Sequence, residues 1–332
     1  VRDLLGGNFY IDDGDEFNPE KKVKLGDKVD YNFTNNVNWI GGYVQAEYHT
    51  EIITAYLTLG YSSVGYKHNN HFLRSDENPD VNKTQDADPI SGYQAKGGLS
   101  YRFDERWAIY GNAGYVSKVP ILDAVINDNT GDLILDPKNE TFISGELGMN
   151  YRSLDGTFNA NVNVYHTTWN DRTVNVTDWD ELTGDEGIFT ITGLNAVHQG
   201  IEFDMAVQAN KWFRLDGALS VGNWKNTNDP TATYKEYGNP DADTTLNVYA
   251  KDLKTGDAPQ TQIALGGTFF PVKGLYLTLN WRHYADFYAD WTVESRLDPD
   301  DRAQSWKVPA YSIWDLHIGY RLPMKSSTGI EL

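Results

Sequence analysis

The alternation of apolar and polar residues constrains this chain more than any other feature. From Phe158 to Val164 every second residue is apolar, and the three residues between them are asparagines. Successive side chains of a β-strand point to opposite faces, so this strand has one apolar and one amide face. Similar rows occur at 53–61, 95–103, 107–115, 143–151, 201–207, 213–221, 263–269, 275–281 and 314–320. Together with Phe158–Val164 and a further strand near Gly41–Tyr48, they predict about eleven strands.

The connections between these strands alternate strictly in length. Short connections are expected at 49–51, 104–106, 152–156, 210–212 and 271–274. Long ones are expected at 67–92, 117–139, 170–194, 224–259 and 290–307. A meander with short turns at one end and long loops at the other is typical of outer-membrane β-barrels, with the short turns periplasmic and the long loops extracellular.

The sequence therefore predicts an all-β protein, an antiparallel up-and-down transmembrane barrel. Residues 1–39 are expected to form an extracellular loop segment, and residues 40–332 a partial barrel. Bacterial single-chain barrels have even strand numbers, and an unclosed sheet leaves backbone groups unsatisfied in lipid. About eleven strands thus indicate a fragment of a longer polypeptide. A soluble β-sandwich or propeller is the alternative.

Composition excludes several other classes of protein. The chain has no cysteine, which excludes zinc–cysteine domains, iron–sulfur proteins, thiol enzymes and disulfide scaffolds. The 28 basic and 47 acidic residues give a net charge of −19, which argues against nucleic acid as a partner. The common serine-hydrolase, metalloprotease and P-loop motifs are missing from the sequence, so no enzyme activity is predicted.

Four short stretches, taken in order, carry a resemblance to a known family. They are Leu135-Asp136-Pro137-Lys138-Asn139-Glu140 with Gly145-Glu146-Leu147-Gly148, Trp169-Asn170-Asp171-Arg172, Asn195-Ala196 with Gly200-Ile201-Glu202, and Val308-Pro309-Ala310-Tyr311 with Asp315-Leu316 and Gly319-Tyr320. Their order and spacing over residues 40–332 resemble the C-terminal half of the barrel of TonB-dependent outer-membrane receptors. In place of the family's Arg-x-Pro, the chain has Ser117-Lys118-Val119-Pro120.

The resemblance implies a 22-stranded barrel with an N-terminal plug domain. It also implies uptake of a scarce nutrient (a siderophore, cobalamin, glycan or peptide) with energy passed from TonB through the plug. The plug and the TonB box are not among these 332 residues. The expected partners are outer-membrane lipid, the plug, TonB and a surface lipoprotein. Two other hypotheses are a barrel-borne surface adhesion or binding protein and a secreted carbohydrate-binding β-module.

Aromatic and polar residues supply the candidate binding positions. Aromatics at strand ends suit the interfacial girdles of a barrel. Six aromatics fall in predicted loops, where they could stack on a ligand or pack the loops together: Trp169, Trp179, Trp224, Tyr234, Tyr237 and Trp291. Ten polar residues are expected to face the lumen, where they could hydrogen-bond the plug: Glu146, Asn159, Asn161, Asn163, Glu202, Asp204, Arg214, Arg282, Asp315 and His317.

No metal or cofactor is predicted, although loop-bound calcium is a weaker alternative. Acidic residues gather in three predicted loops, at 12–16, 178–186 and 298–301, and calcium binds carboxylate oxygens. None of the three matches the spacing of an EF-hand, so a solvated anionic surface is the preferred interpretation. The pair His68 and His71 lacks the further ligands that zinc needs, and both are expected in a wet loop.

Overall fold

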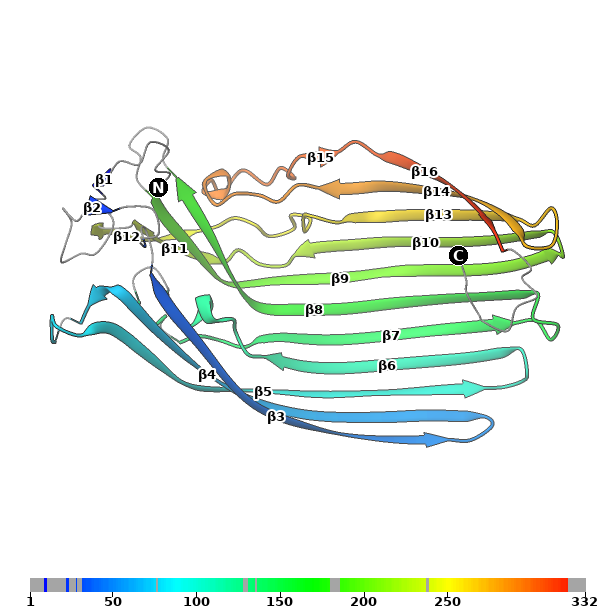
Figure 1. Cartoon of the computed structure of the whole chain (residues 1–332), viewed down its shortest axis with the longest axis horizontal. Helices are drawn as coiled ribbons and strands as arrows, with labels where there is room; N and C mark the ends of the chain where they lie inside the picture. The colour runs from blue at the N-terminus through cyan, green and yellow to red at the C-terminus, as the bar shows by residue number, and fades with distance from the viewer. Residues whose placement is uncertain are drawn as a thin grey trace.

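Eleven long antiparallel strands form one curved sheet whose spatial order follows the sequence (Figure 1). The computed structural model describes residues 9–10, 22–23, 28, 32–75, 77–127, 131–134, 136–179, 186–236 and 239–321. The wall strands are β3 (Phe33–His49), β4 (Ile53–Arg74), β5 (Asn82–Arg102), β6 (Trp107–Lys118), β7 (Glu140–Arg152), β8 (Phe158–Trp179), β9 (Glu186–Asn210), β10 (Phe213–Asn226), β13 (Pro259–Phe269), β14 (Leu275–Tyr288) and β16 (Tyr311–Tyr320).

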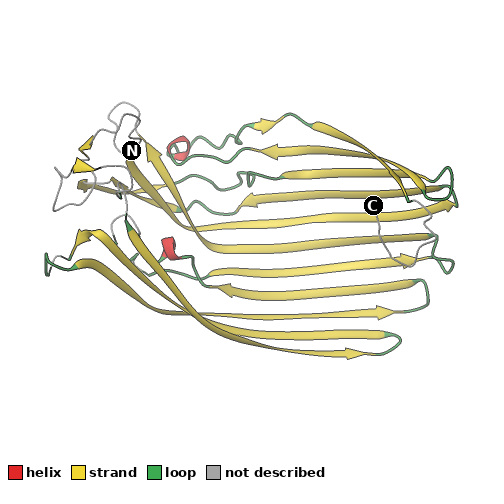
Figure 2. Cartoon of the chain, in the orientation of Figure 1, coloured by secondary structure: helices red, strands yellow, loops and turns green. Residues whose placement is uncertain are grey.

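Shorter elements gather at one end of the sheet. They are β1 (Phe9–Tyr10), β2 (Lys22–Val23), β11 (Thr231–Glu236), β12 (Asn239–Asn247), β15 (Lys307–Val308) and the 3-10 turns η1 (Leu122–Ala124) and η2 (Glu294–Arg296). β11 pairs with β9 and β12, so the β11–β12 hairpin prolongs the sheet beyond the wall. Figure 2 shows strands as the dominant element and both 3-10 turns near this end.

The predicted all-β, up-and-down architecture is confirmed. Within the described part of the chain the sheet is open, with β3 and β16 at its two edges. Apart from the separate two-stranded sheet of β1 and β2, the described strands belong to this one wall and its small extensions, so the soluble β-sandwich alternative is wrong. No helix within the described residues is long and apolar enough to cross a membrane.

The strand ends differ from the prediction on the side of the long loops. β8 continues to Trp179 and β9 begins at Glu186, so most of the predicted loop 170–194 is a hairpin. Likewise β4 runs to Arg74 and β5 starts at Asn82. β3 begins at Phe33, ahead of the predicted start near Gly41. At the opposite end the connections are short, as predicted, with only Lys211 and Trp212 between β9 and β10.

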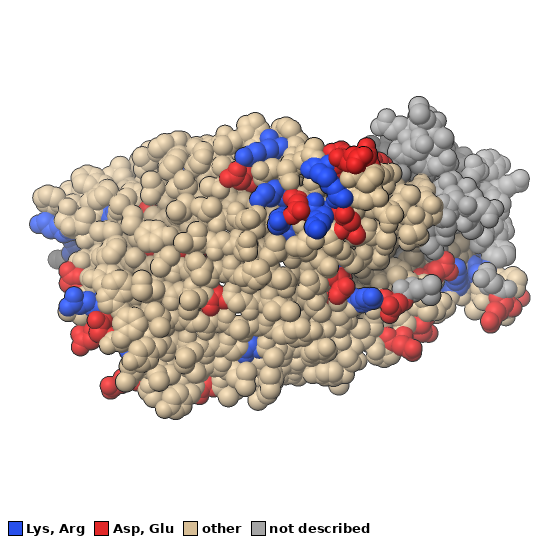
Figure 3. All heavy atoms as spheres, turned by 180° about the vertical axis from the view of Figure 1, so that it is seen from behind, with Lys and Arg blue, Asp and Glu red and all other residues tan. Residues whose placement is uncertain are grey.

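The two faces of the wall differ in chemistry. The outward rows carry large exposed apolar side chains, such as Leu147, Val164 and Ile201. Figure 3 shows a broad face that is mostly uncharged, apart from one group of basic and acidic side chains in its upper middle part and scattered charges toward its ends. On the other face, polar side chains from neighbouring strands bond to one another, so we call it the inner face.

Buried apolar residues lie at the long-loop end rather than behind the wall. One cluster joins β9, β11, the loop before β13 and the loop after β14: Phe189, Ile191, Leu194, Ala232, Val248, Ala250, Leu253 and Val293. We call this packed region the cap. A second cluster, Val64, Tyr66, Val125 and Ile126, seats the η1 loop on β4. The long loops therefore include a packed core of their own.

Candidate functional site

A ladder of hydrogen bonds crosses the inner face at mid-height. The Asn163 side-chain amide donates to Glu146 Oε1 (2.8 Å) and Glu202 Oε2 (3.3 Å), linking β7, β8 and β9. The Asn161 amide donates to Asp204 Oδ1 (3.2 Å) on the next rung. Asn163 is buried, with 8% of its surface exposed. The asparagine stripe of β8 thus binds carboxylates on both neighbouring strands.

The ladder continues toward β4 through phenol and amide groups. Asn112 on β6 donates to Glu146 Oε2 (3.3 Å), and the Tyr56 hydroxyl on β4 donates to Asn112 Oδ1 (3.3 Å). Tyr56 reaches Asn112 across β5 because Gly98 lies between them. A Cβ at Gly98 would lie 2.1 Å from Asn112 Oδ1. A glycine on the intervening strand is therefore needed for this contact.

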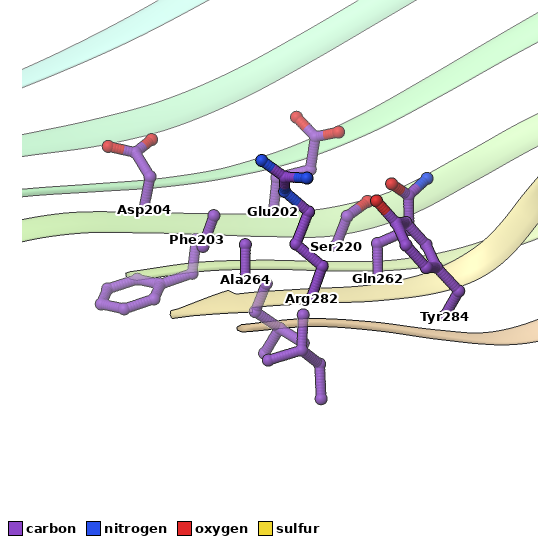
Figure 4. A pocket seen from close by; sticks show the side chains of 11 residues that line it. Glu202, Phe203, Asp204, Ser220, Gln262, Ala264, Arg282 and Tyr284 are labelled. Atoms are coloured by element: carbon purple, nitrogen blue, oxygen red, sulfur yellow. The ribbon is translucent and has the colours of Figure 1, made fainter. Parts of the chain in front are cut away.

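The ladder borders a shallow recess between β9 and β14 (Figure 4). Glu202, Asp204 and Arg282 point to the same side of the sheet, whereas Phe203 points to the other. Arg282 Nη1 binds Asp315 Oδ2 at 3.0 Å, which ties β14 to the edge strand β16. Arg282 is exposed on 45% of its side chain, so its charge is accessible from the inner side.

The other predicted lumen residues lie on the same inner rows. Arg214 and Asp216 form an ion pair on β10, with Nη2 and Oδ1 2.6 Å apart. Asn159 lies two residues before Asn161 on β8, and His317 lies two residues after Asp315 on β16. The structure brings Glu146, Asn161, Asn163, Glu202 and Asp204 into one network, which Arg214 and His317 do not join.

An aromatic cluster lies on the inner face toward the cap. We define it as Tyr165, Trp169, His198 and Trp224, from β8, β9 and β10. The His198 ring lies 6.3 Å from the Trp169 ring and 5.8 Å from the Trp224 ring. Trp224 Nε1 donates to the Tyr165 hydroxyl at 2.8 Å, across β9 at Gly200. A Cβ at Gly200 would lie 2.7 Å from this hydroxyl and 2.6 Å from the Val221 carbonyl oxygen.

Two of the sequence motifs meet beside this cluster. Trp169 Nε1 donates to Glu140 Oε2 at 3.0 Å, and Lys118 Nζ lies 3.3 Å from the same oxygen. Arg172 covers the Trp169 ring, with its guanidinium carbon 4.0 Å from the ring centroid. Burial lowers the pKa of the Arg172 guanidinium, and the charges of Glu140 and Asp290 oppose that shift. Arg172 remains a cation, because the ordinary pKa of arginine lies so far above neutral pH.

A bulge in β8 sets the position of Arg172. The register with β9 shifts between Trp169 and Val174, and Asp171 has a positive φ of 59°. The backbone N–H of Asp171 donates to Asn195 Oδ1 at 2.9 Å. A bulge bends its strand and redirects the next side chains. The Trp169–Arg172 and Asn195 motifs are therefore parts of one local structure.

The predicted loop location is wrong for four of the six candidate aromatics. Trp169 and Trp179 lie on β8, Trp224 on β10 and Tyr234 on β11. Tyr234 and Trp291 pack against the cap core. The side chain of Trp179 and all of Tyr237 lie outside the described residues. Trp169 and Trp224 thus remain the aromatics on the inner face.

Sequence reasoning missed Tyr165 and His198. Tyr165 lies on the inner row of β8, two residues after Asn163. His198 lies on the inner row of β9, four residues before Glu202. Extending the alternation past the predicted strand ends would have found both. The apolar alternation marks only part of each strand, because β8 and β9 continue well beyond it.

The acidic groups that the weaker alternative of loop-bound calcium would use are only partly described. The first acidic group, 12–16, lies outside the described residues, as does most of the second. In the third, Asp298 and Asp301 accept backbone N–H bonds from Asp300 and Ala303 (both 2.9 Å). Among described residues, no group of three or more His, Asp or Glu could hold a metal ion.

The two histidines expected in a wet loop lie within β4 instead. His68 is fully buried, with Nδ1 2.7 Å from Asn35 Oδ1, so the wet-loop expectation is wrong for it. His71 Nε2 lies 2.9 Å from Thr34 Oγ1. The strand extension beyond Lys67 explains the difference, because it carries both residues into the sheet.

Comparisons with known proteins agree with this architecture. The family model described as "TonB dependent receptor-like, beta-barrel" matches residues 2–331. No curated protein matches the chain. Among solved structures, the siderophore receptor PiuA from Acinetobacter baumannii is similar at 15% identity and a TM-score of 0.60, covering 87% of this chain and 37% of that one.

Two further structures are similar at the level of the fold. The copper transporter OprC matches at 13% identity and a TM-score of 0.61, over 87% of this chain and 40% of that one. The ferric-catecholate import receptor Fiu from E. coli K12, in its closed form, matches at 12% identity and a TM-score of 0.54, over 92% and 40%. The chain thus spans about two fifths of the length of these proteins.

Proposed function

Because the chain belongs to the family of TonB-dependent receptor β-barrels, we propose that it forms half of the wall, and several outer loops, of an outer-membrane receptor. This receptor binds a scarce nutrient from outside the cell and passes it inward with energy from TonB. The long-loop end, with the cap, faces the exterior, and the short turns face the periplasm. The apolar outer rows contact lipid.

The aromatic cluster is the observation that carries the proposal of ligand binding. Two indole rings, an imidazole and a phenol meet on the inner face below the cap, beside the Arg172 guanidinium. A ligand that enters through the loops of the proposed receptor would meet this surface before it reached mid-height. Planar rings stack on aromatic side chains, and Arg binds anionic groups.

The inner ladder supports the proposal of a plug domain as partner. Glu146 and Glu202 accept bonds from amide and phenol groups within the described part of the chain. A carboxylate gains more from a charged donor than from a neutral one. Basic groups on the plug would therefore fit this part of the wall.

A metal chelate with planar anionic rings is the first substrate to test. It suits the pairing of Trp169 with Arg172, and PiuA and Fiu, which share the fold, are siderophore or ferric-catecholate receptors. A glycan is the second candidate, because sugars also stack on tryptophan. The alternative of a surface adhesin rests on the packed cap, which could hold a fixed surface toward another cell.

The test is uptake by the cells that make the full-length receptor. Deletion should abolish uptake of one radiolabelled ferric siderophore from a panel under iron limitation, and loss of TonB should have the same effect. Normal uptake of the whole panel by the deletion strain, together with lost surface adhesion, would favour the adhesin.

Point variants then test the aromatic cluster. Trp169→Ala and Trp224→Ala should each weaken siderophore binding by about two- to tenfold, since a stacked aromatic ring contributes about 0.5–1.5 kcal/mol. Trp212→Ala is the matched control, because Trp212 lies in a short turn at the other end and is 55% exposed. Equal losses in all three variants would contradict this position for the binding site.

A further inference from the structure

The outward row of β10 changes character near the cap. Leu219 and Val221 are exposed apolar residues, and the next two residues on the same face are Asn223 and Lys225. At about 3.3 Å per residue, Lys225 lies roughly 13 Å beyond Val221 along the strand. Lys225 therefore lies on the outer surface, just beyond the apolar part of the wall.

Lys225 belongs to a group of basic residues that we call the basic rim. Its members are Lys225, Lys251, Lys254, Arg302 and Lys307. The interleaved acids are Asp229, Asp252 and Asp286, so five cations and three anions leave a net charge of +2 in a chain of −19. Figure 3 shows clustered basic and acidic side chains near the long-loop end of this face.

Most rim cations have a carboxylate partner. Lys225 Nζ lies 2.5 Å from Asp252 Oδ1, Lys307 Nζ lies 2.6 Å from Asp286 Oδ1, and Arg302 binds Asp229 at 2.8 Å. Lys254 differs, because its Nζ donates to the neutral Asn223 Oδ1 at 2.7 Å. The excess positive charge therefore lies on Lys254 and on the exposed Lys251.

Like charges are opposed at this point. Lys225 and Lys254 face each other across an antiparallel β-bridge, and directly opposed like charges destabilise such a pair. Burial lowers the pKa of the Lys254 ammonium, and the charges of Lys225 and Lys307 lower it further, whereas the Asp286 carboxylate opposes that shift. A bound anion would relieve this repulsion.

Aromatic rings accompany the cations at the same level. The Lys307 ammonium lies 5.7 Å from the Tyr288 ring, and the Arg302 guanidinium lies 5.1 Å from the Tyr249 ring. Trp306, next to Lys307, is 68% exposed. Aromatic rings with Lys or Arg are typical of side chains at a membrane–water boundary.

We propose that the basic rim binds the phosphate groups of a glycolipid in the outer leaflet, with a phosphate held between Lys225 and Lys254. An apolar wall directly below the lysines receives the acyl chains, and the interfacial aromatics contact the headgroup. The inference rests on the proposed outer-membrane position of the wall but not on which nutrient is carried. It adds a lipid contact on the outer surface, away from the inner aromatic cluster.

The test uses the full-length receptor in phosphatidylcholine nanodiscs, with lipid A as the phosphorylated probe and native mass spectrometry as the readout. Lys225→Gln/Lys254→Gln should reduce retained lipid A roughly tenfold. Each lysine near an anionic surface strengthens binding by about fivefold, and Asp252 already offsets part of the charge of Lys225. Dephosphorylated lipid A should bind no better to the wild type than to the variant.

The control variant is Lys211→Gln/Lys273→Gln, which removes the same charge from two exposed lysines at the short-turn end. It should retain lipid A fully. Equal loss in both variants, or displacement of lipid A by equimolar inorganic phosphate, would overturn the inference.

Single Lys254→Gln guards against misfolding of the double variant, because glutamine can still donate to Asn223. Retention of lipid A at the wild-type level by a folded Lys254→Gln variant would also overturn the inference. A wild-type receptor that fails to enter nanodiscs would instead contradict the proposed membrane position.

Discussion

An arginine at position 162 should cost far more than one at position 161. Val162 points outward from β8, between Met149 and Phe203 on the neighbouring strands, whereas Asn161 points inward to Asp204. Phe158, whose ring lies 5.6 Å from Tyr151, marks the short-turn end of the apolar row. Val162 lies four residues beyond Phe158, and each residue of a strand advances about 3.3 Å. With a strand tilt of about 40° from the barrel axis, Val162 lies about 10 Å deeper than Phe158, near the middle of an apolar band of about 25 Å.

The magnitudes follow from these positions. An arginine on the lipid face near mid-depth costs about 2–4 kcal/mol. On the inner face, Asn161→Arg loses a 3.4 Å bond from Tyr110, worth about 0.5–1.5 kcal/mol, and gains attraction to Asp204. Val162→Arg should therefore be about 0.5–3.5 kcal/mol more destabilising than Asn161→Arg.

The assay is reversible urea-dependent folding of the full-length receptor into phosphatidylcholine vesicles, followed by tryptophan fluorescence. Both variants add the same side chain to the same strand, so the free-energy difference reports the facing alone. Equal costs, or a larger cost for Asn161→Arg, would refute the assignment of outer and inner faces.

Three further predictions concern packing and charge. Gly200→Ala should destabilise the barrel by about 1–3 kcal/mol in the same urea titration, because the new Cβ would lie 2.6 Å from the Val221 carbonyl oxygen. The control Gly145→Ala should be neutral, because the space around Gly145 is open. Glu140→Gln should lower the free energy of unfolding by about 1 kcal/mol, because the bonds from Trp169 and Lys118 to the carboxylate weaken. An unchanged Trp169 fluorescence spectrum and an unchanged stability would contradict that role. Burial, and then Asp257, raise the pKa of Asp290, so the folded state binds this proton more tightly than the unfolded state. Cap stability should therefore fall as the pH rises through that raised pKa, and hydrogen exchange of residues 286–306 should show this fall in the wild type but not in Asp290→Asn.

The wall could be predicted because its signal is local. Each wall strand alternates apolar and polar residues, as in the asparagine row of β8, and the short turns leave little freedom in register. This is why Glu146, Asn163 and Glu202 could be assigned to one face before their bonds were known. The bonds themselves depend on register across three strands, as in the pairing of Asn163 with Gly148 and Glu202.

The upper part of the wall could not be predicted in the same way. Beyond Val164 the outward row of β8 becomes polar, so the contrast between the faces fades although the strand continues to Trp179. The bulge at Asp171 then changes the phase of the alternation. The pattern therefore predicts loops at Trp169 and Trp224, which lie on β8 and β10. The cap core is built from segments distant in sequence and has no local signal.

The most direct test of the membrane wall is a spin-label scan along β8 in the full-length receptor in vesicles. These 332 residues contain no cysteine. Single cysteines from position 158 to position 176 can therefore be labelled one at a time, once any cysteine elsewhere in the receptor has been replaced by serine. We predict that oxygen accessibility alternates with a period of two from 158 to 164, with maxima at Phe158, Ala160, Val162 and Val164. It should fall to aqueous values beyond the bulge at Asp171. Oxygen accessibility that is low and uniform along the whole strand would contradict a wall exposed to lipid.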